Sequence, residues 1–468
     1  MFDKSKLIKI EDFLWEIPKS FRDDMRVPAR IYTHEEMLDA ISIDKSLNQL
    51  VNVSTLPGIK GFALAMPDIH EGYGFPVGGV AAFDSEEGII SPGGIGYDIN
   101  CGVRLLRSER KFSEIQPHLQ NLGRTIFHEV PSGVGRSGRL SLKGEEFDLV
   151  LRKGAWRMIE LGYGDADDLE HTESGGMLHT AEPEFVSKQA KDRGHDQLGT
   201  MGAGNHFVEV GVVETIFDED EAKRLNIYKD QVTVLIHTGS RGFGHQIATD
   251  YIRTMMKVMP QYGITLPDRE LACAPFSSKE GQEYFKAMSA GANFAWANRQ
   301  LITWEVRKAW EDVLGKEGGR LSMVYDVAHN IAKLEEYTLN GKRYNLVIHR
   351  KGATRSFPGQ PVLIPGSMGT HSYILVGQEK ALIASFGSSC HGAGRRMSRT
   401  RARKETSAKE LRQRLVDMGI VVNAGSAKGL TEESPEAYKD VNEVVDVIHG
   451  AGIAKKVARL RPTAVIKG

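Results

Sequence analysis

Residues 91–104, SPGGIGYDINCGVR, hold Asp98 and Cys101 three positions apart in a glycine-dense segment. Glycine permits the left-handed bends and the close backbone approach that a loop needs in order to fold around an ion or a phosphate. A thiolate beside a carboxylate is a mixed soft and hard ligand pair, which suits zinc, iron or manganese better than calcium or magnesium. The competing interpretation is a buried apolar thiol next to a turn-forming aspartate.

Three histidines further along the chain share one local context. His206, His237 and His329 each follow or adjoin an apolar, strand-like run. The end of a buried strand is a usual position for a site residue in mixed α/β folds, although a single histidine there is more often a hydrogen-bonded loop or core residue. With Asp98 and Cys101 they make five ligands, which is enough for two metal ions if the thiolate bridges them. We therefore predict a metal site.

His391 has surroundings that suit a nucleophile. It lies in CHGAGRR, where its neighbours are small and two arginines follow four and five residues later. Imidazole can attack a nucleotide α-phosphate to give a phosphoramidate, and guanidinium groups can hold the phosphate oxygens bidentately. The alternatives are a further metal ligand and a charged helix start without a function.

Familiar nucleotide-binding motifs are absent from the sequence. The chain contains neither GxxxxGK[ST] nor the KxDG signature of lysine-dependent nucleotidyl transfer. A P-loop is thereby excluded as a motif, and lysine is not the expected nucleophile. The loops GAGNHF, IPGSMGTHS and HGAGR can instead bind phosphates through backbone N–H groups.

The hydrophobic pattern predicts the elements that position these side chains. Period-two and continuous apolar runs predict strands over residues 29–33, 77–83, 103–108, 207–213, 232–236 and 463–468. Apolar spacings of three and four predict helices over residues 34–52, 147–193, 246–259, 283–314 and 441–462. Glycine-rich loops are expected at 238–244 and, with basic residues, at 350–352.

Composition limits the classes of protein that remain. The net charge of −1 means that any nucleic-acid partner needs a local basic patch, such as the six basic residues between 395 and 404. The three cysteines form no disulfide framework, which fits a reducing compartment. The chain has no signal-peptide core and no run of 18 apolar residues. We expect a cytoplasmic protein without a membrane segment.

Seven motifs, taken in order, resemble the RtcB RNA ligases: GGIGYDINCGVR, GAGNHFVEV, IHTGSRGFGHQ, YDVAHN, HRKGATR, PGSMGT and CHGAGR. The resemblance implies an α+β fold with central β-sheets, surrounding helices and glycine-rich active-site loops, forming one catalytic domain over residues 1–468. It also implies an enzyme that uses GTP and Mn²⁺ to join RNA 2′,3′-cyclic-phosphate or 3′-phosphate ends to 5′-hydroxyl ends. RNA is then the substrate, and an archease-type activating protein is a candidate partner.

The same resemblance implies a role for each metal-type ligand. Cys101 would bridge two manganese ions, with Asp98 and His206 completing one site and His237 and His329 the other. The choice of manganese comes from the resemblance, because thiolate and imidazole ligands alone favour zinc.

Nucleotide and RNA contacts are implied in the same way. His391 is the expected guanylylated nucleophile, with Glu209, Ser372 and Lys467 near guanine and Tyr438 stacked near the base. The full set of positions that match GTP contacts is Asn205, Glu209, Asn330, Pro365, Gly366, Ser367, Met368, Ser372, Gly392, Ala393, Gly394, Tyr438 and Lys467. The positions expected to hold RNA or phosphate oxygens are Arg241, Arg350, Lys351 and Arg395.

One departure and two rival functions remain. His371 stands beside Ser372 where the family pattern has a small residue. A metal-dependent phosphoesterase would hydrolyse cyclic phosphate ends without using His391 as a nucleophile, so covalent labelling by GTP separates it from a ligase. A non-catalytic RNA-binding module has no need for five metal-type ligands.

Overall fold

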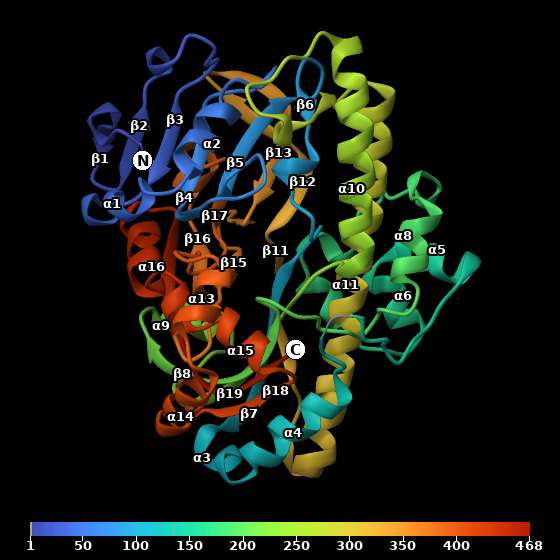
Figure 1. Ribbon diagram of the computed structural model, residues 1–468. Coiled ribbons are helices and arrows are strands. Elements are labelled where there is room, and N and C mark those ends of the chain that lie inside the picture. The colour runs from blue at the N-terminus through green and yellow to red at the C-terminus, as the bar shows by residue number, and fades with distance from the viewer. Residues whose placement is uncertain (1, 134) are drawn as a thin grey trace.

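Two large β-sheets organise the computed structural model, which describes residues 2–133 and 135–468 (Figure 1). The first sheet has the strand order β1 (Ile8–Glu11), β2 (Leu14–Ile17), β3 (Ala29–Tyr32), β4 (Ala63–His70), β5 (Val77–Asp84), β13 (Lys342–Lys351) and β12 (Asn330–Leu339). The second has the order β11 (Ser322–Ala328), β7 (Gly102–Lys111), β9 (Gln231–Thr238), β8 (Phe207–Ile216), β19 (Ala454–Lys467), β16 (Ser372–Gly377) and β15 (Pro361–Ile364), with β18 (Val421–Ala424) beside β19.

Most strand pairs in these sheets are antiparallel, whereas β3 with β4 and β18 with β19 run parallel. Two small sheets pair β6 (Ile89–Ile90) with β10 (Ala274–Pro275), and β14 (Ala353–Arg355) with β17 (Ser388–Cys390). Strands β4 and β5 are buried along nearly their whole length. Burial on both faces explains why such strands appear in the sequence as continuous apolar runs.

Helices surround the sheets. In the first half of the chain they are α1 (Leu38–Ile41), α2 (Ser46–Val53), α3 (Phe112–Ile115), α4 (Leu119–Glu129), α5 (Gly144–Lys153), α6 (Ala155–Glu160), α7 (Asp167–Glu170), α8 (Lys188–Gly194) and α9 (Glu219–Arg224). In the second half they are α10 (Arg241–Val258), α11 (Lys279–Leu314), α12 (Glu379–Ala384), α13 (Arg399–Glu405), α14 (Ala408–Asp417), α15 (Ala427–Glu432) and α16 (Val441–Gly450). Short 3-10 turns connect several of these elements.

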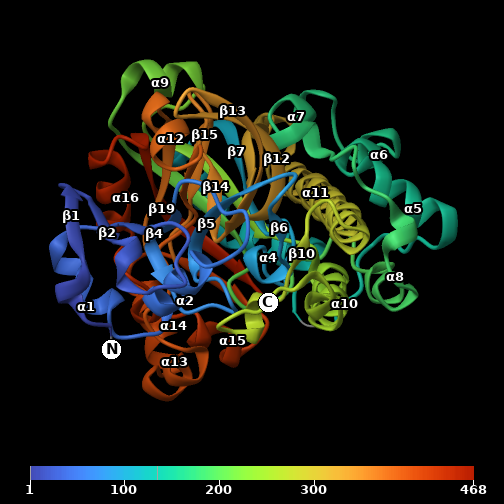
Figure 2. The same cartoon turned by 90° about the horizontal axis from the view of Figure 1, so that it is seen from above.

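The long helix α11 forms a second organising element. The Ser278 side chain caps it by accepting a hydrogen bond from the Gly281 N–H, and Gly315 ends it at a φ of 62°. Residues 287–303 are buried all round, since α10, α5 and α6 pack against this helix, and α8 packs against α10 (Figures 1 and 2). Among the described residues, neither this helix nor another is apolar enough for its length to cross a membrane.

The structure confirms the predicted α+β class and most of the predicted elements. The strands expected at 29–33, 77–83, 103–108, 207–213 and 232–236 correspond to β3, β5, β7, β8 and β9. The helix expected at 246–259 lies within α10 except for its last residue, and the helix expected at 283–314 lies within α11. The helical stretch 147–193 corresponds to α5 to α8 with turns between them.

The helix expected over residues 34–52 is wrong in its continuity. It is divided into α1 and α2, and Ser42 ends the first of them. The side chain of Asp44 then accepts a hydrogen bond from the Ser46 N–H at 2.8 Å. Such a contact between an aspartate and the backbone two residues later forms a turn, which interrupts a pattern that otherwise has helical spacing.

Two further predictions are wrong near glycines. The loop expected at 238–244 is largely helical, because α10 begins at Arg241. The helix expected over residues 441–462 ends at Gly450, and Gly452, with a φ of 73°, separates it from β19. Residues 454–460 pair with β16 and residues 458–467 pair with β8, so sheet formation overrides the local pattern.

The two large sheets are joined directly at His329. This residue lies between the last residue of β11, in the second sheet, and the first residue of β12, in the first sheet. Side chains from both sheets therefore converge around this junction.

Candidate active site

The predicted metal ligands lie at the same end of four neighbouring strands in the second sheet. Strands β11, β7, β9 and β8 are neighbours in this order. His329 follows β11, Cys101 precedes β7, His237 is the penultimate residue of β9 and His206 precedes β8. Because neighbouring strands are antiparallel, the end of one meets the start of the next. Asp98 joins them from the loop before β7, so all five side chains come together.

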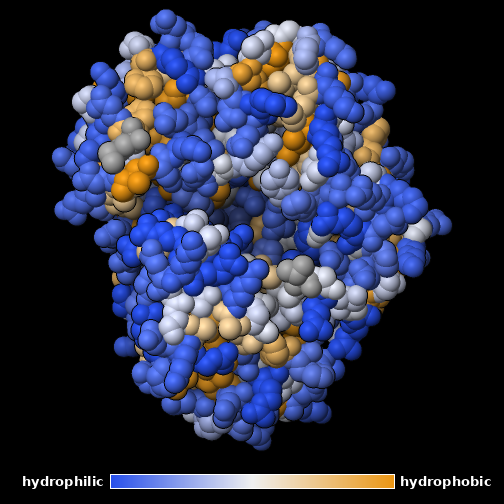
Figure 3. Space-filling view, in the orientation of Figure 1, coloured by the Kyte–Doolittle hydropathy of each residue, from blue (hydrophilic) through white to orange (hydrophobic). Residues whose placement is uncertain are grey.

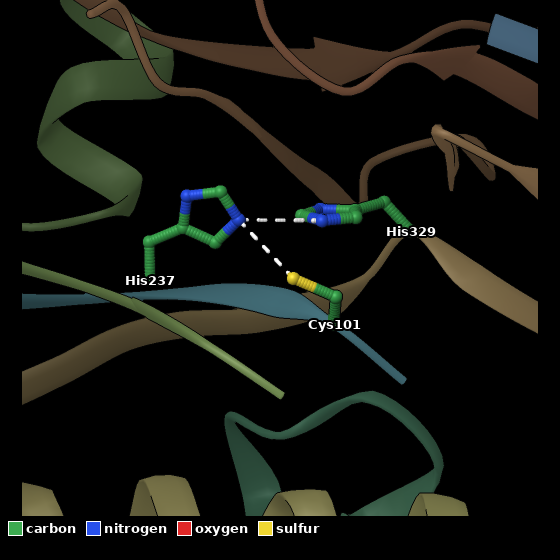
Figure 4. A group of neighbouring side chains, drawn as sticks. All are labelled: Cys101, His237 and His329. Atoms are coloured by element: carbon green, nitrogen blue, oxygen red, sulfur yellow. Dashed lines mark hydrogen bonds between the residues drawn. The ribbon is translucent and has the colours of Figure 1, made fainter. Parts of the chain in front are cut away.

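The donor atoms of these side chains are close enough to share ions. The Sγ atom of Cys101 lies 3.3 Å from Nε2 of His206 and 3.3 Å from Nε2 of His237. Nε2 of His237 also lies 3.3 Å from Nε2 of His329, and Figure 4 shows it directed toward both neighbours. On the other side, Nε2 of His206 lies 2.9 Å from Oδ2 of Asp98. Two candidate ligand groups therefore share the Cys101 sulfur.

This donor set fits a pair of transition-metal ions. At metal–ligand distances of about 2.0–2.3 Å, two donors on one tetrahedral ion lie roughly 3.3–3.8 Å apart. Nδ1 of His206 lies 3.0 Å from the Met201 carbonyl oxygen. When Nδ1 donates its proton to this oxygen, Nε2 is left free to bind an ion. Burial lowers the pKa of His237 and of His329 well below the usual value, so both imidazoles are neutral. A neutral imidazole is the form that binds a metal.

The two anionic candidates differ in how they are held. Burial opposes ionisation of Asp98, but the interaction with the neighbouring His206 outweighs burial and lowers the pKa of the carboxyl to about 2. Burial, and then the Asp98 charge, raise the pKa of the Cys101 thiol well above its usual value. A bridging thiolate at this position therefore needs cations beside it, which is the condition that two ions would supply.

His391 lies next to this cluster and is held by the first sheet. It follows β17, and its ring centroid is 4.9 Å from that of His329. Nδ1 of His391 lies 2.6 Å from Oδ2 of the fully buried Asp68, on β4, and the backbone N–H of His391 donates to the same oxygen at 3.0 Å. An N–H at Nδ1 leaves the lone pair on Nε2. The two contacts with Asp68 fix the orientation of the His391 ring.

The five candidate metal ligands are called the metal-type cluster below. A cavity of about 300 Å³ connects His391 with this cluster. Its lining includes Asp98, Cys101, His237 and His329. Figure 3 shows a hollow near the middle of this face of the molecule. The predicted nucleotide contacts that also line the cavity are Asn205, Asn330, Pro365, Gly366, Ser367, Met368, Gly392, Ala393, Gly394, Tyr438 and Lys467.

Two predicted guanine contacts lie outside this lining. Glu209 is buried within β8, and burial raises the pKa of its carboxyl to about 8. Ser372 begins β16, and its Oγ accepts a hydrogen bond from the Gly366 N–H at 3.1 Å. This contact helps to hold the 365–368 loop in its conformation. The neighbouring His371 points elsewhere and pairs with Glu214 at 3.1 Å.

The four basic residues predicted to hold RNA fall into different settings. Arg395 lines the cavity and donates to Glu433 at 2.8 Å. Lys351 also lines it, and burial lowers the pKa of its ammonium to about 7. Arg241 donates to the Thr200 hydroxyl at 3.2 Å.

Arg350 does not match its predicted setting. With Lys351 it lies inside β13, not in a loop. Its side chain is fully buried and forms two hydrogen bonds to Glu335, at 2.7 and 2.9 Å. An RNA strand cannot reach a guanidinium in that position, so the structure assigns Arg350 to the interior of the protein.

The sequence analysis missed two residues beside His391 and Tyr438. Asp68 lies 323 positions from His391 in the chain, and the signal that could have identified it is an aspartate within an apolar run, MPDIH. Glu433 is buried, hydrogen-bonds to the Tyr438 hydroxyl and pairs with Arg395 and Arg399. Its sequence context, TEESPEAY, gives no comparable signal.

The fold and the site together define a class of protein. A mixed α+β chain holds a buried cysteine, histidine and carboxylate cluster next to a histidine oriented for attack, at a cavity lined by glycine-rich loops. This arrangement places a cluster that could hold metal ions beside a histidine of fixed orientation, as in the active site of an enzyme.

Comparison with known proteins gives the family. Residues 49–468 match the family model described as tRNA-splicing ligase RtcB. Proteins of that name from Thermococcus kodakarensis, Archaeoglobus fulgidus and Nanoarchaeum equitans are 51%, 52% and 53% identical to this chain, and each alignment covers 99% of both proteins. The chain belongs to the tRNA-splicing ligase RtcB family, and this membership places it among the RNA ligases.

Proposed function

We propose that this chain joins RNA 2′,3′-cyclic-phosphate or 3′-phosphate ends to 5′-hydroxyl ends, using GTP and Mn²⁺, through a guanylyl group carried by His391. The observation that carries the proposal is the contact between Nδ1 of His391 and Asp68, 2.6 Å long, in a cavity that also holds two metal-type ligand groups. We further propose that residues 1–468 act as one catalytic domain, because the cavity lining extends from residue 70 to residue 467.

His391 would act as the nucleophile in the first step. Its Nε2 lone pair attacks the α-phosphorus of GTP, a P–N bond forms, and the bond to the bridging oxygen breaks so that pyrophosphate leaves. Asp68 accepts the Nδ1 hydrogen bond and stabilises the positive charge that develops on the imidazole. The phosphoramidate is a high-energy intermediate with a good leaving group.

The RNA then takes over the guanylyl group. An oxygen of the RNA 3′-phosphate attacks the same phosphorus and the P–N bond breaks, which returns the lone pair to Nε2. The RNA 5′-hydroxyl next attacks the activated 3′-phosphate, and GMP leaves as the phosphodiester forms. A cyclic phosphate end must first be opened by water to give the 3′-phosphate.

The metal-type cluster fits a role beside these steps. Asp98, Cys101 and His206 would hold one ion, and Cys101, His237 and His329 the other. Such ions would neutralise phosphate charge and act as Lewis acids. The protein's own contribution is to fix the donors at strand ends, where antiparallel pairing holds their spacing.

The guanosine would lie against the 365–368 and 392–394 loops. Tyr438 lines the cavity there, and the Arg395 guanidinium lies over its ring at 4.9 Å from the centroid. Lys467 reaches the cavity from β19, and burial lowers the pKa of its ammonium to about 8. These side chains offer a stacking surface and donors for a purine base.

Covalent labelling tests the proposal. Wild-type protein incubated with Mn²⁺ and GTP labelled at the α-phosphate should retain the label on a denaturing gel, and γ-labelled GTP should leave none. His391→Ala should lose the label, whereas His179→Ala, at an exposed histidine, should keep it. Equal labelling of wild type and His391→Ala would refute the assignment. Cleavage of cyclic phosphate ends by His391→Ala at the wild-type rate, with no ligation by either protein, would favour the phosphoesterase.

A further inference from the structure

Three aromatic rings form a continuous array at a part of the cavity wall that the proposed chemistry does not use. Tyr73 and Tyr97 both line the cavity. Their ring centroids are 5.6 Å apart with an interplanar angle of 61°. Tyr97 in turn stacks on His245, at 4.7 Å and 23°. The array therefore leads from the cavity to the surface, because His245 is exposed.

The array adjoins the reacting groups. Tyr97 directly precedes Asp98, and Tyr73 lies in the turn between β4, which holds Asp68, and β5. The two tyrosines come from segments that do not contribute to the 365–368 and 392–394 loops or to Tyr438. A guanosine held at those loops would leave the aromatic wall free for a second nucleotide.

A basic side chain lies at each end of the array. Nζ of Lys351 donates to the Tyr73 carbonyl oxygen and to that of Phe75. At the outer end, Arg193 is near His245, where burial and the Arg193 charge lower the pKa of the imidazole. A row of rings therefore lies between two basic side chains. Single-stranded nucleic acids are held by this combination of aromatic faces and basic groups.

We propose that the base of the nucleotide at the 3′-phosphate end of the RNA packs against Tyr73 and Tyr97. The inference rests on the proposed ligase function and adds a specificity element to it. The 3′-phosphate must reach the guanylyl group on His391. The base of the nucleotide that carries this phosphate therefore has to lie no further from His391 than the length of one nucleotide. Stacking accepts any base, because every base has a π-face, and it requires an end that is not paired.

The test combines protein and RNA changes in a double-mutant cycle. The protein variants are Tyr97→Ala and Tyr97→Phe, with Tyr262→Ala as a control at an exposed tyrosine outside the cavity. The RNA probes are 3′-phosphate oligonucleotides with a normal or an abasic terminal nucleotide, and 5′-hydroxyl oligonucleotides modified in the same way. The measurement is the single-turnover rate at which each 3′-phosphate RNA discharges pre-guanylylated enzyme, as a function of RNA concentration, followed by ligation with each 5′-hydroxyl RNA.

Tyr97→Ala should weaken the apparent affinity for the normal 3′-phosphate RNA about 5- to 100-fold. Tyr97→Phe, which keeps the ring, should stay close to wild type. The abasic 3′ end should weaken binding to wild type similarly and add little further loss in Tyr97→Ala, because each change removes the same contact.

Three outcomes would overturn the proposal: independent, additive losses for Tyr97→Ala and the abasic 3′ end, coupling to the abasic 5′ end instead, or no change in RNA affinity. Labelling of Tyr97→Ala by GTP separates this failure from that of the proposed function. If wild type does not label, the ligase mechanism fails. If both proteins label and the affinities do not differ, the aromatic contact alone is wrong.

Discussion

Oδ2 of Asp68 lies 2.6 Å from Nδ1 of His391 and accepts the backbone N–H of the same residue at 3.0 Å. Both contacts tie a loop that follows β17 to the interior of β4, so the ring is fixed by its backbone and by its side chain. A neighbouring ammonium, Lys439, donates to the carbonyl oxygens of Pro67 and Ile69 and holds this part of β4 in place. His391 is therefore preorganised before any nucleotide binds.

Asp68→Asn tests the role of that contact. The amide keeps the shape, but its NH₂ group can donate to Nδ1, which places the imidazole proton on Nε2 and removes the attacking lone pair. The rate of guanylylation should fall by about 100-fold or more. Metal content should stay at the wild-type level, and the matched control is Asp165→Asn at an exposed aspartate. Guanylylation of Asp68→Asn at an unchanged rate would show that Asp68 does not orient His391.

Cys101→Ser tests whether the two ligand groups depend on one sulfur. A thiolate can bridge two cations and offset their repulsion, whereas a serine hydroxyl would need a large fall in pKa to do the same. Both ions should be lost or loosened, and labelling by GTP should fall with them. Without metal, the free energy of unfolding should change by only about 1 kcal/mol.

The control for that variant is Cys273→Ser, which alters a buried thiol outside the cavity. Metal content by mass spectrometry and GTP labelling should be measured on the same samples. Two tightly bound ions and normal labelling in Cys101→Ser would make Cys101 a core thiol and remove the bridge from this account.

Arg350→Met tests the interior assignment of Arg350. The substitution leaves the Glu335 carboxylate, whose side chain is 10% exposed, without its partner. Loss of one partner from a buried ion pair should lower the free energy of unfolding by about 3–5 kcal/mol. Denaturant unfolding measures this loss, with Arg401→Met as an exposed control. Weaker RNA binding at unchanged stability would instead return Arg350 to the RNA interface.

Glu305→Gln tests a pH dependence at a residue outside the cavity lining. The Glu305 side chain is fully buried, neither carboxyl oxygen has a hydrogen-bond partner, and burial raises its pKa to about 9. Between the unfolded pKa of about 4.3 and this value, the folded state binds one more proton than the unfolded state. This carboxyl therefore makes stability fall as pH rises, by up to about 1.4 kcal/mol per unit.

The variant carries no titrating group at that position. Its stability relative to wild type should be smallest near pH 5 and should increase toward pH 9, as measured by thermal unfolding across that range. A difference that stays constant with pH would show that Glu305 is ionised in the folded protein.

Much of the site could be predicted from local sequence, because its metal-type ligands adjoin strands. Cys101, His206, His237 and His329 each have an apolar run beside them, and antiparallel pairing brings these strand ends together. The order in which these strands pair is long-range information that the local sequence does not give.

The relation between His391 and Asp68 could not be predicted in that way. It joins two segments of the first half and the last quarter of the chain, and it depends on how β17 packs against β4. At Arg350 the sequence analysis predicted a setting that the structure does not show. Its neighbours in HRKGATR suggest an exposed basic loop, but β13 continues through it and pairs with β12 and β5 on either side. A local pattern of charge and glycine does not reveal that a strand is central.

We propose that His391 carries a guanylyl group on Nε2. The most direct measurement is peptide mapping by mass spectrometry after incubation with GTP and Mn²⁺, with the digest kept at alkaline pH because a phosphoramidate is labile to acid. The account predicts one added GMP per chain, on the peptide that contains His391, and its loss on brief acid treatment. An acid-stable adduct on a lysine or serine peptide, or no adduct in protein that still ligates RNA, would contradict it.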